Sequence, residues 1–335
     1  MIARNTARVV PGVAVLVAGA AVAHVLSTVV GVNRLILAVG LGVVVANSVG
    51  TPEWAEDGLA THKLWLETGI VLMGARIAVD QLLSVGLSLL VLVVGFLGFS
   101  LLFVELVARN VFEIPDRLGS LLAAGYSICG VSAIAAVSSG VRAKSEQIAY
   151  AVATILLFDA VTLATYPAIG RLLDLPDIVF GIWAGISMVS TGPVVAAGFA
   201  YSPTAGQWAT VTKLGRNVFI GVVAILYAVY YARQNGGDSE TSVASWRYFW
   251  GQFPKFVLGF VLVAGVASAG LLSDAEVALL ERGYQLLFLV AFVGLGTSIE
   301  IQGMRRTGIK PLLVVLSALV TVSVLSLGAT MLVFA

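Results

Sequence analysis

The chain has 335 residues, of which 59% are hydrophobic and 11% are charged, and its mean hydropathy is +1.01. A soluble domain carries about 25% charged residues, so we expect lipid to be the main solvent of this protein. Its 19 basic and 18 acidic residues leave a net charge of +1, which excludes a basic nucleic-acid-binding protein and an acidic disordered tail. The single cysteine, Cys129, excludes an internal disulfide, and two histidines are too few for a histidine-rich metal site.

Long uncharged runs separated by charged residues predict membrane-spanning helices, each of which needs about 20 mostly apolar residues. The runs are too long and continuous for the strands of a membrane barrel, and helices satisfy their own backbone hydrogen bonds in lipid. We therefore predict an all-α polytopic membrane protein with about 11 transmembrane helices. In chain order they lie within Val9–Asn33, Leu35–Pro52, Leu59–Val79, Gln81–Val104, Leu118–Val141, Gln147–Gly170, Ile178–Thr212, Asn217–Ala232, Phe256–Ser273, Gly283–Ile299 and Pro311–Ala335.

Three features of these runs refine the prediction. The first run has too long an apolar core for a signal peptide and is expected to be retained. Ile178–Thr212 is long enough for one span plus a polar break, and the hydrophilic segment Arg233–Trp250 resembles a linker between bundles. With a cytoplasmic N-terminus, more Lys and Arg residues fall on the cytoplasmic side, which is the usual bias.

Two predicted spans are interrupted by small polar residues. Ala124–Ala133 reads Ala-Gly-Tyr-Ser-Ile-Cys-Gly-Val-Ser-Ala, and Ala291–Glu300 reads Ala-Phe-Val-Gly-Leu-Gly-Thr-Ser-Ile-Glu. If residues 1–33 form an extra helix, residues 34–171 and 178–335 form two sets of five spans, with the interrupted span fourth in each. Because five is odd, the second set would be inverted relative to the first. Paired breaks in inverted repeats point to the binding site of a transporter.

Half-helices that end inside a membrane expose N–H groups at one end and carbonyl groups at the other, and the N–H end attracts anions. The alternative is that these glycines only allow close helix crossing. A third polar patch precedes Pro193 in the sequence. The predicted substrate-binding residues in these three segments are Ser127, Ile128, Cys129, Gly130, Ser132, Gly294, Gly296, Thr297, Ser298, Ser190 and Thr191.

Three charged residues are further candidates. Lys213 and Arg216 lie at the start of the eighth predicted span, where cations could offset the cost of desolvating an anion; the alternative is that they extend to the membrane surface. Asp159 lies in the middle of a predicted span, and a carboxylate there suggests a coupling site for Na⁺ or H⁺, or a partner for Arg216. Charges near span ends are expected to be interfacial or paired: Glu67, Arg76, Glu105 and Glu300.

Several segments resemble one known family. Ser127–Ala136, which reads Ser-Ile-Cys-Gly-Val-Ser-Ala-Ile-Ala-Ala, resembles the signature of the YeiH-type family of proposed sulfate exporters. The resemblance extends over about residues 35–330 through Gly69–Ile77, Phe180–Gly185, Ala209–Arg216 and Val290–Gly296. The family is similar to the bile-acid symporter and sodium/proton antiporter superfamily. This similarity implies inverted five-helix repeats, with a panel and a core bundle each drawn from both repeats, and two broken helices that cross.

The sequence departs from the family pattern at one place. Where the family usually has His, Glu and Gln after its Trp-Ala-Gly, this chain has Val189, Ser190 and Pro193. The change removes titratable groups from the seventh predicted span. It therefore puts in doubt both the usual substrate of the family and proton coupling through that His–Glu pair.

Together these features predict a secondary active transporter of a small inorganic or organic anion, such as sulfate or a sulfonate, which works by alternating access. A cation antiporter of the same fold coupled to Na⁺ or H⁺, and a channel, stay open. No ATP-binding loop pattern and no catalytic constellation occurs, so we expect no enzyme. We expect a multi-pass protein of the cell membrane whose partners are a small anion and the bilayer, with no nucleic acid and no cofactor beyond a coupling ion. A homodimer stays open.

Overall fold

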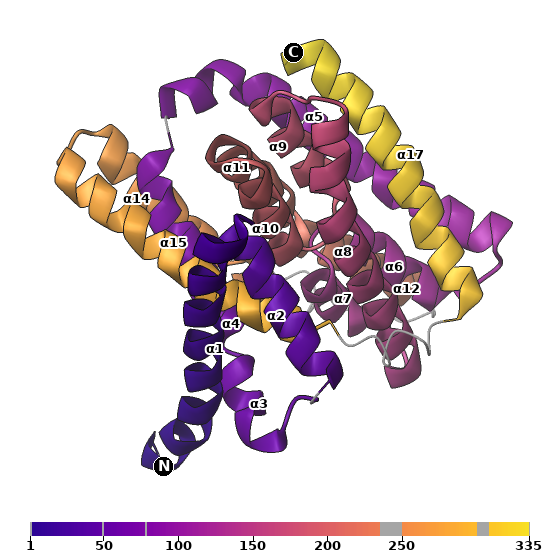
Figure 1. Cartoon of the computed structure of the whole chain (residues 1–335). Helices are drawn as coiled ribbons and strands as arrows, with labels where there is room; N and C mark the ends of the chain where they lie inside the picture. The colour runs from indigo at the N-terminus through magenta and orange to yellow at the C-terminus, as the bar shows by residue number, and fades with distance from the viewer. Residues whose placement is uncertain (1, 49, 78, 235–249, 300–307, 335) are drawn as a thin grey trace. The chain divides into compact units, whose positions relative to one another are not determined.

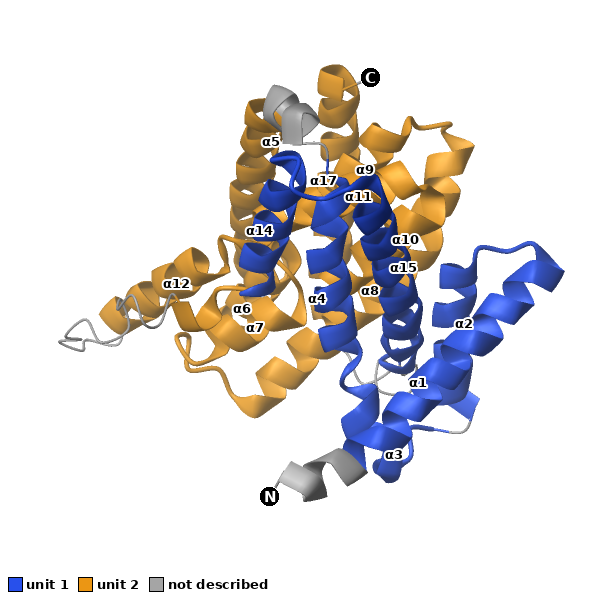
Figure 2. Cartoon of the chain, turned by 90° about the vertical axis from the view of Figure 1, so that its left-hand side faces the viewer, with its two compact units in different colours: residues 1–84, 255–302 blue, residues 85–254, 303–335 orange. Residues whose placement is uncertain are grey.

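A computed structural model describes the backbone of residues 2–48, 50–77, 79–234, 250–299 and 308–334. Glu300 and most of the predicted linker Arg233–Trp250 lie outside these ranges. Within them the secondary structure is helical and contains no strand, as Figure 1 shows. The chain divides into two compact units: unit 1 comprises Met1–Ser84 and Lys255–Gln302, and unit 2 comprises Val85–Pro254 and Gly303–Ala335 (Figure 2).

Unit 1 is a bundle of helices drawn from both of its chain segments. Helix α15 begins with a capping box, because the Ser273 hydroxyl accepts a hydrogen bond from the Glu276 backbone N–H at 3.3 Å and the Glu276 carboxylate accepts one from the Ser273 N–H at 2.8 Å. The helices are α1 (Ile2–Val30), α2 (Arg34–Ser48), α3 (Glu53–Leu59), α4 (His62–Met73), the 3₁₀ turn η1 (Gly74–Arg76), α14 (Phe256–Ser268) and α15 (Asp274–Thr297).

Glycines in unit 1 allow helices to touch backbone to backbone. A Cβ atom on Gly296 of α15 would lie 2.2 Å from the Val39 carbonyl oxygen and 2.9 Å from Cα of Gly42, both on α2. A Cβ atom on Gly294 would lie 2.3 Å from Cβ of His62 on α4. These are the small-residue crossings that membrane helices use to approach closely.

The break predicted within Ala291–Glu300 does not fall at Gly294 or Gly296, where the helix continues, and its last residue, Glu300, lies outside the described residues. Helix α15 runs without interruption from Asp274 to Thr297. Its polar end closes the last turn, because the hydroxyls of Thr297 and Ser298 donate to the Gly294 carbonyl at 2.8 and 3.1 Å. The glycines serve the crossing with α2 and α4, which was the alternative that the sequence left open.

Unit 2 holds the segments with the predicted charged candidates. Helix α5 continues into a π-helical turn, η2, and helix α8 is 28 residues long with Pro167 inside it. The elements are α5 (Val79–Leu106), η2 (Val107–Val111), α6 (Asp116–Ser127), α7 (Val131–Ser138), α8 (Ser145–Leu172), α9 (Asp177–Ser187), α10 (Thr191–Tyr201), α11 (Pro203–Asn217), α12 (Ile220–Gln234) and α17 (Ile309–Phe334).

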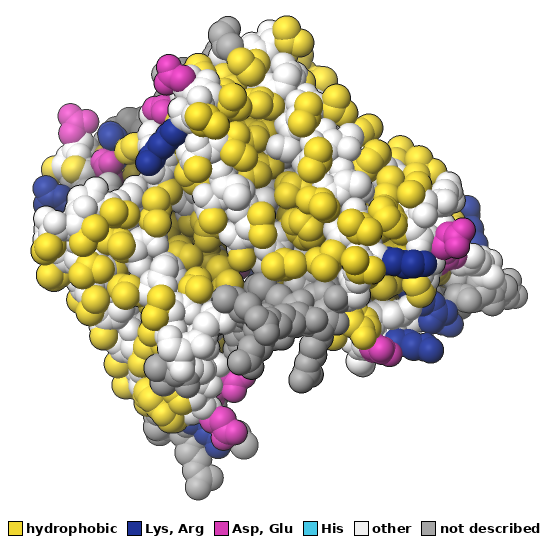
Figure 3. Space-filling model, turned by 45° about the vertical axis from the view of Figure 1, so that its right-hand side comes forward, with side chains coloured by type: hydrophobic (Ala, Val, Ile, Leu, Met, Phe, Trp, Pro, Cys, Tyr) yellow, Lys and Arg dark blue, Asp and Glu magenta, His cyan; other side chains and the backbone are white. Residues whose placement is uncertain are grey.

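Apolar length and apolar exposure identify a multi-pass membrane protein. Six described helical segments are long and apolar enough to cross a membrane: Arg8–Val30, Gly86–Val111, Ser145–Leu172, Pro203–Gln234, Asp274–Thr297 and Ile309–Phe334. Three shorter helices, α2, α9 and α14, are also apolar. Large apolar side chains such as Leu87, Leu102 and Leu332 are exposed, and hydrophobic side chains predominate on the face in Figure 3. Such a surface requires lipid around it.

Candidate functional site

The first predicted break is a chain reversal. Helix α6 ends at Ser127 and α7 begins at Val131, which confirms the interruption expected within Ala124–Ala133. The two helices then fold back on each other: a Cβ atom on Gly125 would lie 3.0 Å from Cγ1 of Ile134. At the open end, Nη1 of Arg117 donates to the Arg142 carbonyl at 2.8 Å. We call residues 115–144 the first hairpin.

This reversal differs from the sequence prediction of a span over Leu118–Val141. A straight helix of that length would hold its ends about 35 Å apart, whereas the hairpin brings its two ends into hydrogen-bond contact. The turn depends on Gly130, whose φ is +71°, a conformation that glycine adopts without the penalty of a side chain. Hydropathy detects an apolar segment but not its reversal, so the sequence pattern looked like a span.

A second hairpin follows α8. Helix α9 ends at Ser187 and α10 begins at Thr191, with Met188–Ser190 between them. At its open end, the rings of Phe180 and Tyr201 stack at 4.0 Å, and the Tyr201 hydroxyl donates to the Leu175 carbonyl at 2.5 Å. We call residues 176–202 the second hairpin. The break predicted within Ile178–Thr212 thus separates two helices that fold back, and α11 supplies the rest of that segment.

The two hairpins share a local sequence. Each begins with Pro-Asp, at 115–116 and 176–177, and the aspartate lies in the first turn of its helix, where it stabilises the positive end of the helix dipole. The first helix of each hairpin ends with Ala-Gly-X-Ser, at 124–127 and 184–187. This similarity pairs the break at 128–130 with the break at 188–190, not with residues 294–298 as the sequence analysis proposed.

The tips of both hairpins meet halfway along α8. A Cβ atom on Gly130 would lie 1.9 Å from the Ser190 hydroxyl oxygen and 3.2 Å from Cγ2 of Ile155. The Asp159 carboxylate accepts a hydrogen bond from the Ser190 N–H at 2.9 Å. Ile155 and Asp159 lie near the middle of α8, whose 28 residues span about 42 Å.

The hairpins approach this point from opposite ends of α8. The first hairpin runs directly into the start of α8 at Ser145. The second packs its open end on the last turns of α8, where a Cβ atom on Gly170 would lie 2.4 Å from the Phe180 ring and 2.9 Å from the Tyr201 ring. Unit 2 therefore contains two helical hairpins that point toward each other.

Arg216 of α11 joins the two tips. It is 2% exposed, and its guanidinium donates only to backbone carbonyls at the ends of α6 and α9. Nε donates to Ser127 at 3.0 Å, Nη2 to Ser127 at 2.7 Å and Tyr126 at 2.8 Å, and Nη1 to Gly185 at 3.0 Å, Met188 at 2.9 Å and Ile186.

These carbonyls are the groups that helix C-termini leave without intrahelical partners, and they carry partial negative charge. Every nitrogen of the Arg216 guanidinium donates to one of these carbonyls. This side chain therefore holds the hairpins together and has no pair of free N–H groups for an oxyanion.

Lys213 lies one turn before Arg216 and is differently placed. It is fully buried, and its ammonium donates to the carbonyls of Met188 at 3.1 Å and Val189. Burial at 0% exposure contradicts the alternative that it extends to the membrane surface. An ammonium carries three hydrogens, so the two acceptors leave one donor of Lys213 available.

Several polar atoms beside the tips have no hydrogen-bond partner. The buried oxygens without one in the described part of the chain are Ser127 Oγ, Ser190 Oγ, Thr212 Oγ1, Asn217 Oδ1 and, on α17, Thr330 Oγ1. The amide nitrogen of Asn217 donates to the Thr191 hydroxyl at 3.0 Å. Buried polar atoms nearly always have partners, so this concentration suggests a place for a ligand.

The remaining predicted residues divide between the units. Ile128, Cys129 and Gly130 form the buried tip of the first hairpin, and Ser132 is exposed at the start of α7. Gly294, Gly296, Thr297 and Ser298 belong to unit 1, whereas the site described here is built from unit 2 alone.

With each side chain in its usual ionisation state, the formal charge of this interior is positive. Among described residues the buried Asp, Glu, Lys and Arg side chains are Asp159, Lys213 and Arg216, which are 3%, 0% and 2% exposed. One carboxylate and two cations leave a formal charge of +1. The ion pairs formed by described residues lie elsewhere and include neither Lys213 nor Arg216. The pairing of Asp159 with Arg216, one of the sequence alternatives, is thus not observed.

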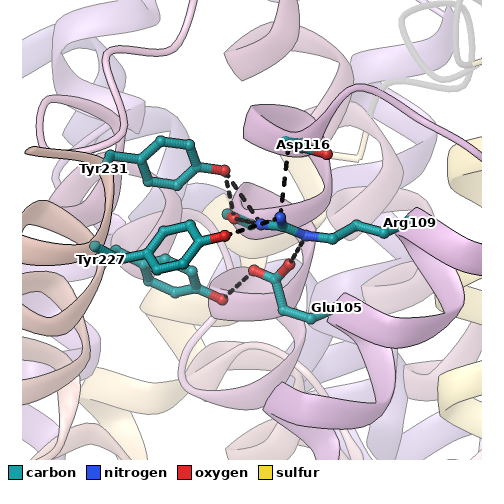
Figure 4. Close-up of polar contacts among 7 residues, drawn as sticks. Glu105, Arg109, Asp116, Tyr227 and Tyr231 are labelled. Carbon is teal, nitrogen blue, oxygen red and sulfur yellow. Dashed lines mark hydrogen bonds and ion pairs between the residues drawn. The ribbon is translucent and has the colours of Figure 1, made fainter. Parts of the chain in front are cut away.

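A second polar cluster ties the base of the first hairpin to α5 and α12 (Figure 4). Arg109, in the π-helical turn, forms ion pairs with Glu105 at 2.6 Å and Asp116 at 3.5 Å. The Tyr227 hydroxyl donates to the other Glu105 oxygen at 2.6 Å, and Arg109 donates to the Tyr231 hydroxyl at 3.3 Å. Glu105 is therefore a paired charge, as predicted, and so is Arg76, which pairs with Glu281 at 3.2 Å.

Comparison with known proteins places the chain in a family. Residues 11–315 match the sequence profile of the family described as "Conserved hypothetical protein 698". The chain belongs to this family. A UPF0324 membrane protein of Nitratidesulfovibrio vulgaris is 34% identical over 84% of this chain and 79% of its own length. The UPF0324 inner membrane protein YeiH of Escherichia coli K12 is 32% identical over 85% of this chain and 82% of its own length.

These relatives confirm the YeiH-type resemblance and the membrane location. Their names state no activity. No solved structure matches the chain.

Proposed function

We propose that this protein is a secondary active transporter of a small anion, such as sulfate or a sulfonate, with its substrate site where the two hairpin tips meet. The observation that carries the proposal is the net positive charge of this buried cluster, in which Lys213 and Arg216 outnumber Asp159. An uncompensated charge in a low-dielectric interior is costly. A bound anion would neutralise it.

The donors that the site offers suit an oxyanion. The free hydrogen of the Lys213 ammonium, the unpartnered hydroxyl of Ser127 and the N-terminal N–H groups of α7 all lie at the tips. Helix N-termini favour negative charge. Arg216 contributes its charge and holds the tips in place, while Lys213 is the direct ligand.

The hairpins also supply a basis for alternating access. Each hairpin is followed by a long helical segment, α8 in the first case and the consecutive helices α11 and α12 in the second, so residues 114–172 and 175–234 form two similar units that each cross the membrane once. An odd number of crossings makes the second unit inverted, and binding sites of transporters lie at the interface of inverted repeats. Movement of one hairpin tip at a time would open the site to opposite sides. These units largely overlap the longer repeats, 34–171 and 178–335, expected from the sequence.

We further propose that the eleven apolar segments comprise nine crossings and these two hairpins, with a cytoplasmic N-terminus. Reversal of the first hairpin moves Arg142 and Lys144 to the same side as Arg109 and Arg117. That strengthens the excess of Lys and Arg on the cytoplasmic side, which sets orientation. The relation to the bile-acid symporter and antiporter superfamily rests on sequence resemblance.

The experiment is ligand-dependent thermal unfolding of the purified protein with sulfate, methanesulfonate or acetate. An anion present at about 100 times its Kd stabilises the folded state by about 2.7 kcal/mol. Lys213→Gln keeps a hydrogen-bond donor but removes the charge, and we expect it to abolish this stabilisation. The matched control is Arg171→Gln, because Arg171 also donates to a backbone carbonyl, that of Ala200, but is exposed.

Counterflow in proteoliposomes then tests whether the protein transports the anion as a carrier. Exchange of labelled anion against an unlabelled gradient requires an alternating carrier and is not expected of a channel. The proposal is overturned if none of the anions stabilises the protein, or if Lys213→Gln binds anion as tightly as Arg171→Gln. Stabilisation by Na⁺ alone would favour the cation antiporter.

A further inference from the structure

Asp159 is the one carboxylate among the described residues at the hairpin tips. Its Oδ1 atom accepts the Ser190 N–H at 2.9 Å, at the positive end of α10. The same serine abuts Gly130 of the first hairpin. Asp159 therefore touches the second tip directly, at the point where it meets the first, and its charge acts on both.

Among titratable side chains, Lys213 acts directly on Asp159, and further titratable groups surround Lys213 and Arg216. Lys213 and Arg216 lie on α11, Cys129 lies at the first tip and Tyr126 lies on α6. Tyr166 lies on α8, about two helical turns after Asp159. The Tyr126 hydroxyl donates to backbone carbonyls of Ser187 and Ala318, and that of Tyr166 donates to Ser323 on α17. Both cations are engaged by carbonyls, so neither forms an ion pair with the carboxylate.

The protonation state of Asp159 thus sets the charge of the site. With Asp159 ionised, the two cations and one carboxylate sum to +1; with Asp159 protonated, they sum to +2. An anion at the tips is repelled by the ionised carboxylate and attracted more strongly once that charge is gone. Coupling of this kind is reciprocal, because an anion that binds better to the protonated form also favours protonation.

We propose that Asp159 takes up one proton as the anion binds, so that anion and H⁺ cross the membrane in the same direction. The inference rests on the proposed anion site. The proton comes from water and forms an O–H bond at the Asp159 carboxylate, whose Oδ1 atom accepts the Ser190 N–H. Protonation also converts a charged hydrogen bond to the tip of the second hairpin into a weaker neutral one, which eases release of that tip once the anion is bound.

Asp159→Asn separates charge from structure. The asparagine carbonyl oxygen can still accept the Ser190 N–H, so the contact with α10 is kept while the negative charge and the titration are lost. The matched control is Glu105→Gln, which removes a carboxylate from the cluster at the base of the first hairpin. The probes are sulfate and methanesulfonate, which do not titrate between about pH 5 and 9, the range in which coupling groups of transporters commonly act.

For the wild type we expect the Kd of the anion to rise by up to about tenfold per pH unit as the carboxylate ionises, since one proton is linked to each anion. For Asp159→Asn we expect a pH-independent Kd close to the wild-type value at low pH. Glu105→Gln should follow the wild-type profile. In weakly buffered solution, the wild type should take up about one proton per anion bound and Asp159→Asn none.

The outcomes separate the two proposals. If anion binds but Asp159→Asn keeps the wild-type pH profile and proton uptake, the proton goes elsewhere and the coupling role is overturned while the anion site stands. If neither anion binds at any pH, the proposed function fails and the coupling with it. Proton uptake by the wild type requires no variant, so its absence overturns the inference even if Asp159→Asn does not fold.

Discussion

Gly130→Ala tests whether the hairpin tips must touch. Two costs add at this position. Alanine at φ +71° and ψ −129° pays about 1–3 kcal/mol, because L-residues rarely adopt this backbone conformation. The added Cβ would also lie 1.9 Å from the Ser190 hydroxyl oxygen, 3.1 Å from the Ser190 Cβ and 3.2 Å from Cγ2 of Ile155, so the hydroxyl must rotate away and the tips must shift as well.

Gly270→Ala is the matched control. Gly270 has nearly the same φ, +70°, but an added Cβ there would meet nothing within 4 Å. It should therefore show the cost of alanine at a positive φ without the steric cost. We expect Gly130→Ala to lower the free energy of unfolding by clearly more than this control, and to lower anion exchange by about a hundredfold, the typical penalty for a displacement near 1 Å in a functional site.

The assay combines thermal unfolding with counterflow in proteoliposomes. In the Gly130→Ala background, Ser190→Gly removes the obstructing side chain and should restore part of the exchange, but not the loss caused by φ. The reasoning is refuted if Gly130→Ala and Gly270→Ala lose the same stability and both exchange anion at the wild-type rate, because the tips would then not be in contact.

Two further changes test the packing on which the site depends. Gly296→Ala should destabilise the protein by about 1–3 kcal/mol, the usual cost of overpacking, because its Cβ would lie 2.2 Å from a backbone oxygen of α2; Gly328→Ala, where nothing lies within 4 Å, should have no such effect in thermal unfolding. Tyr227→Phe should cost about 1.5–3 kcal/mol by losing its hydrogen bond to a carboxylate. Tyr230→Phe, which loses only a 3.3 Å contact with Arg109, should cost less, and an equal loss would contradict the importance of the Tyr227 contact.

The membrane class and several site residues follow from the sequence. Composition and long apolar runs predict an all-helical protein in lipid because the hydrophobic effect depends on the local content of each segment. Asp159, Lys213 and Arg216 stood out for the same reason, since a charge within an apolar run is costly wherever the run lies. The break at 128–130 was visible as small polar residues where a helix prefers leucine.

The local sequence pattern did not predict that the break at 128–130 pairs with the break at 188–190. Glycines at 294 and 296 have the same local composition as those at 125 and 130, yet the first pair packs against α2 and α4 while the second pair permits a reversal. Which role a glycine takes depends on the surface that approaches it, and this surface comes from distant parts of the chain. The break at 188–190 lacks a glycine of its own and was predicted as a polar break within one long run, without the reversal of the chain.

The function of the two cations shows the same limit. Their charge is a property of the sequence, but their partners are not. Arg216 reaches carbonyls that α6 and α9 leave open at the ends of two separate hairpins, whereas Lys213, one turn away, keeps a donor. A backbone carbonyl lacks an intrahelical partner only where a helix ends. Its contact with a side chain distant in the sequence forms only when the chain folds, so the local sequence pattern does not predict it.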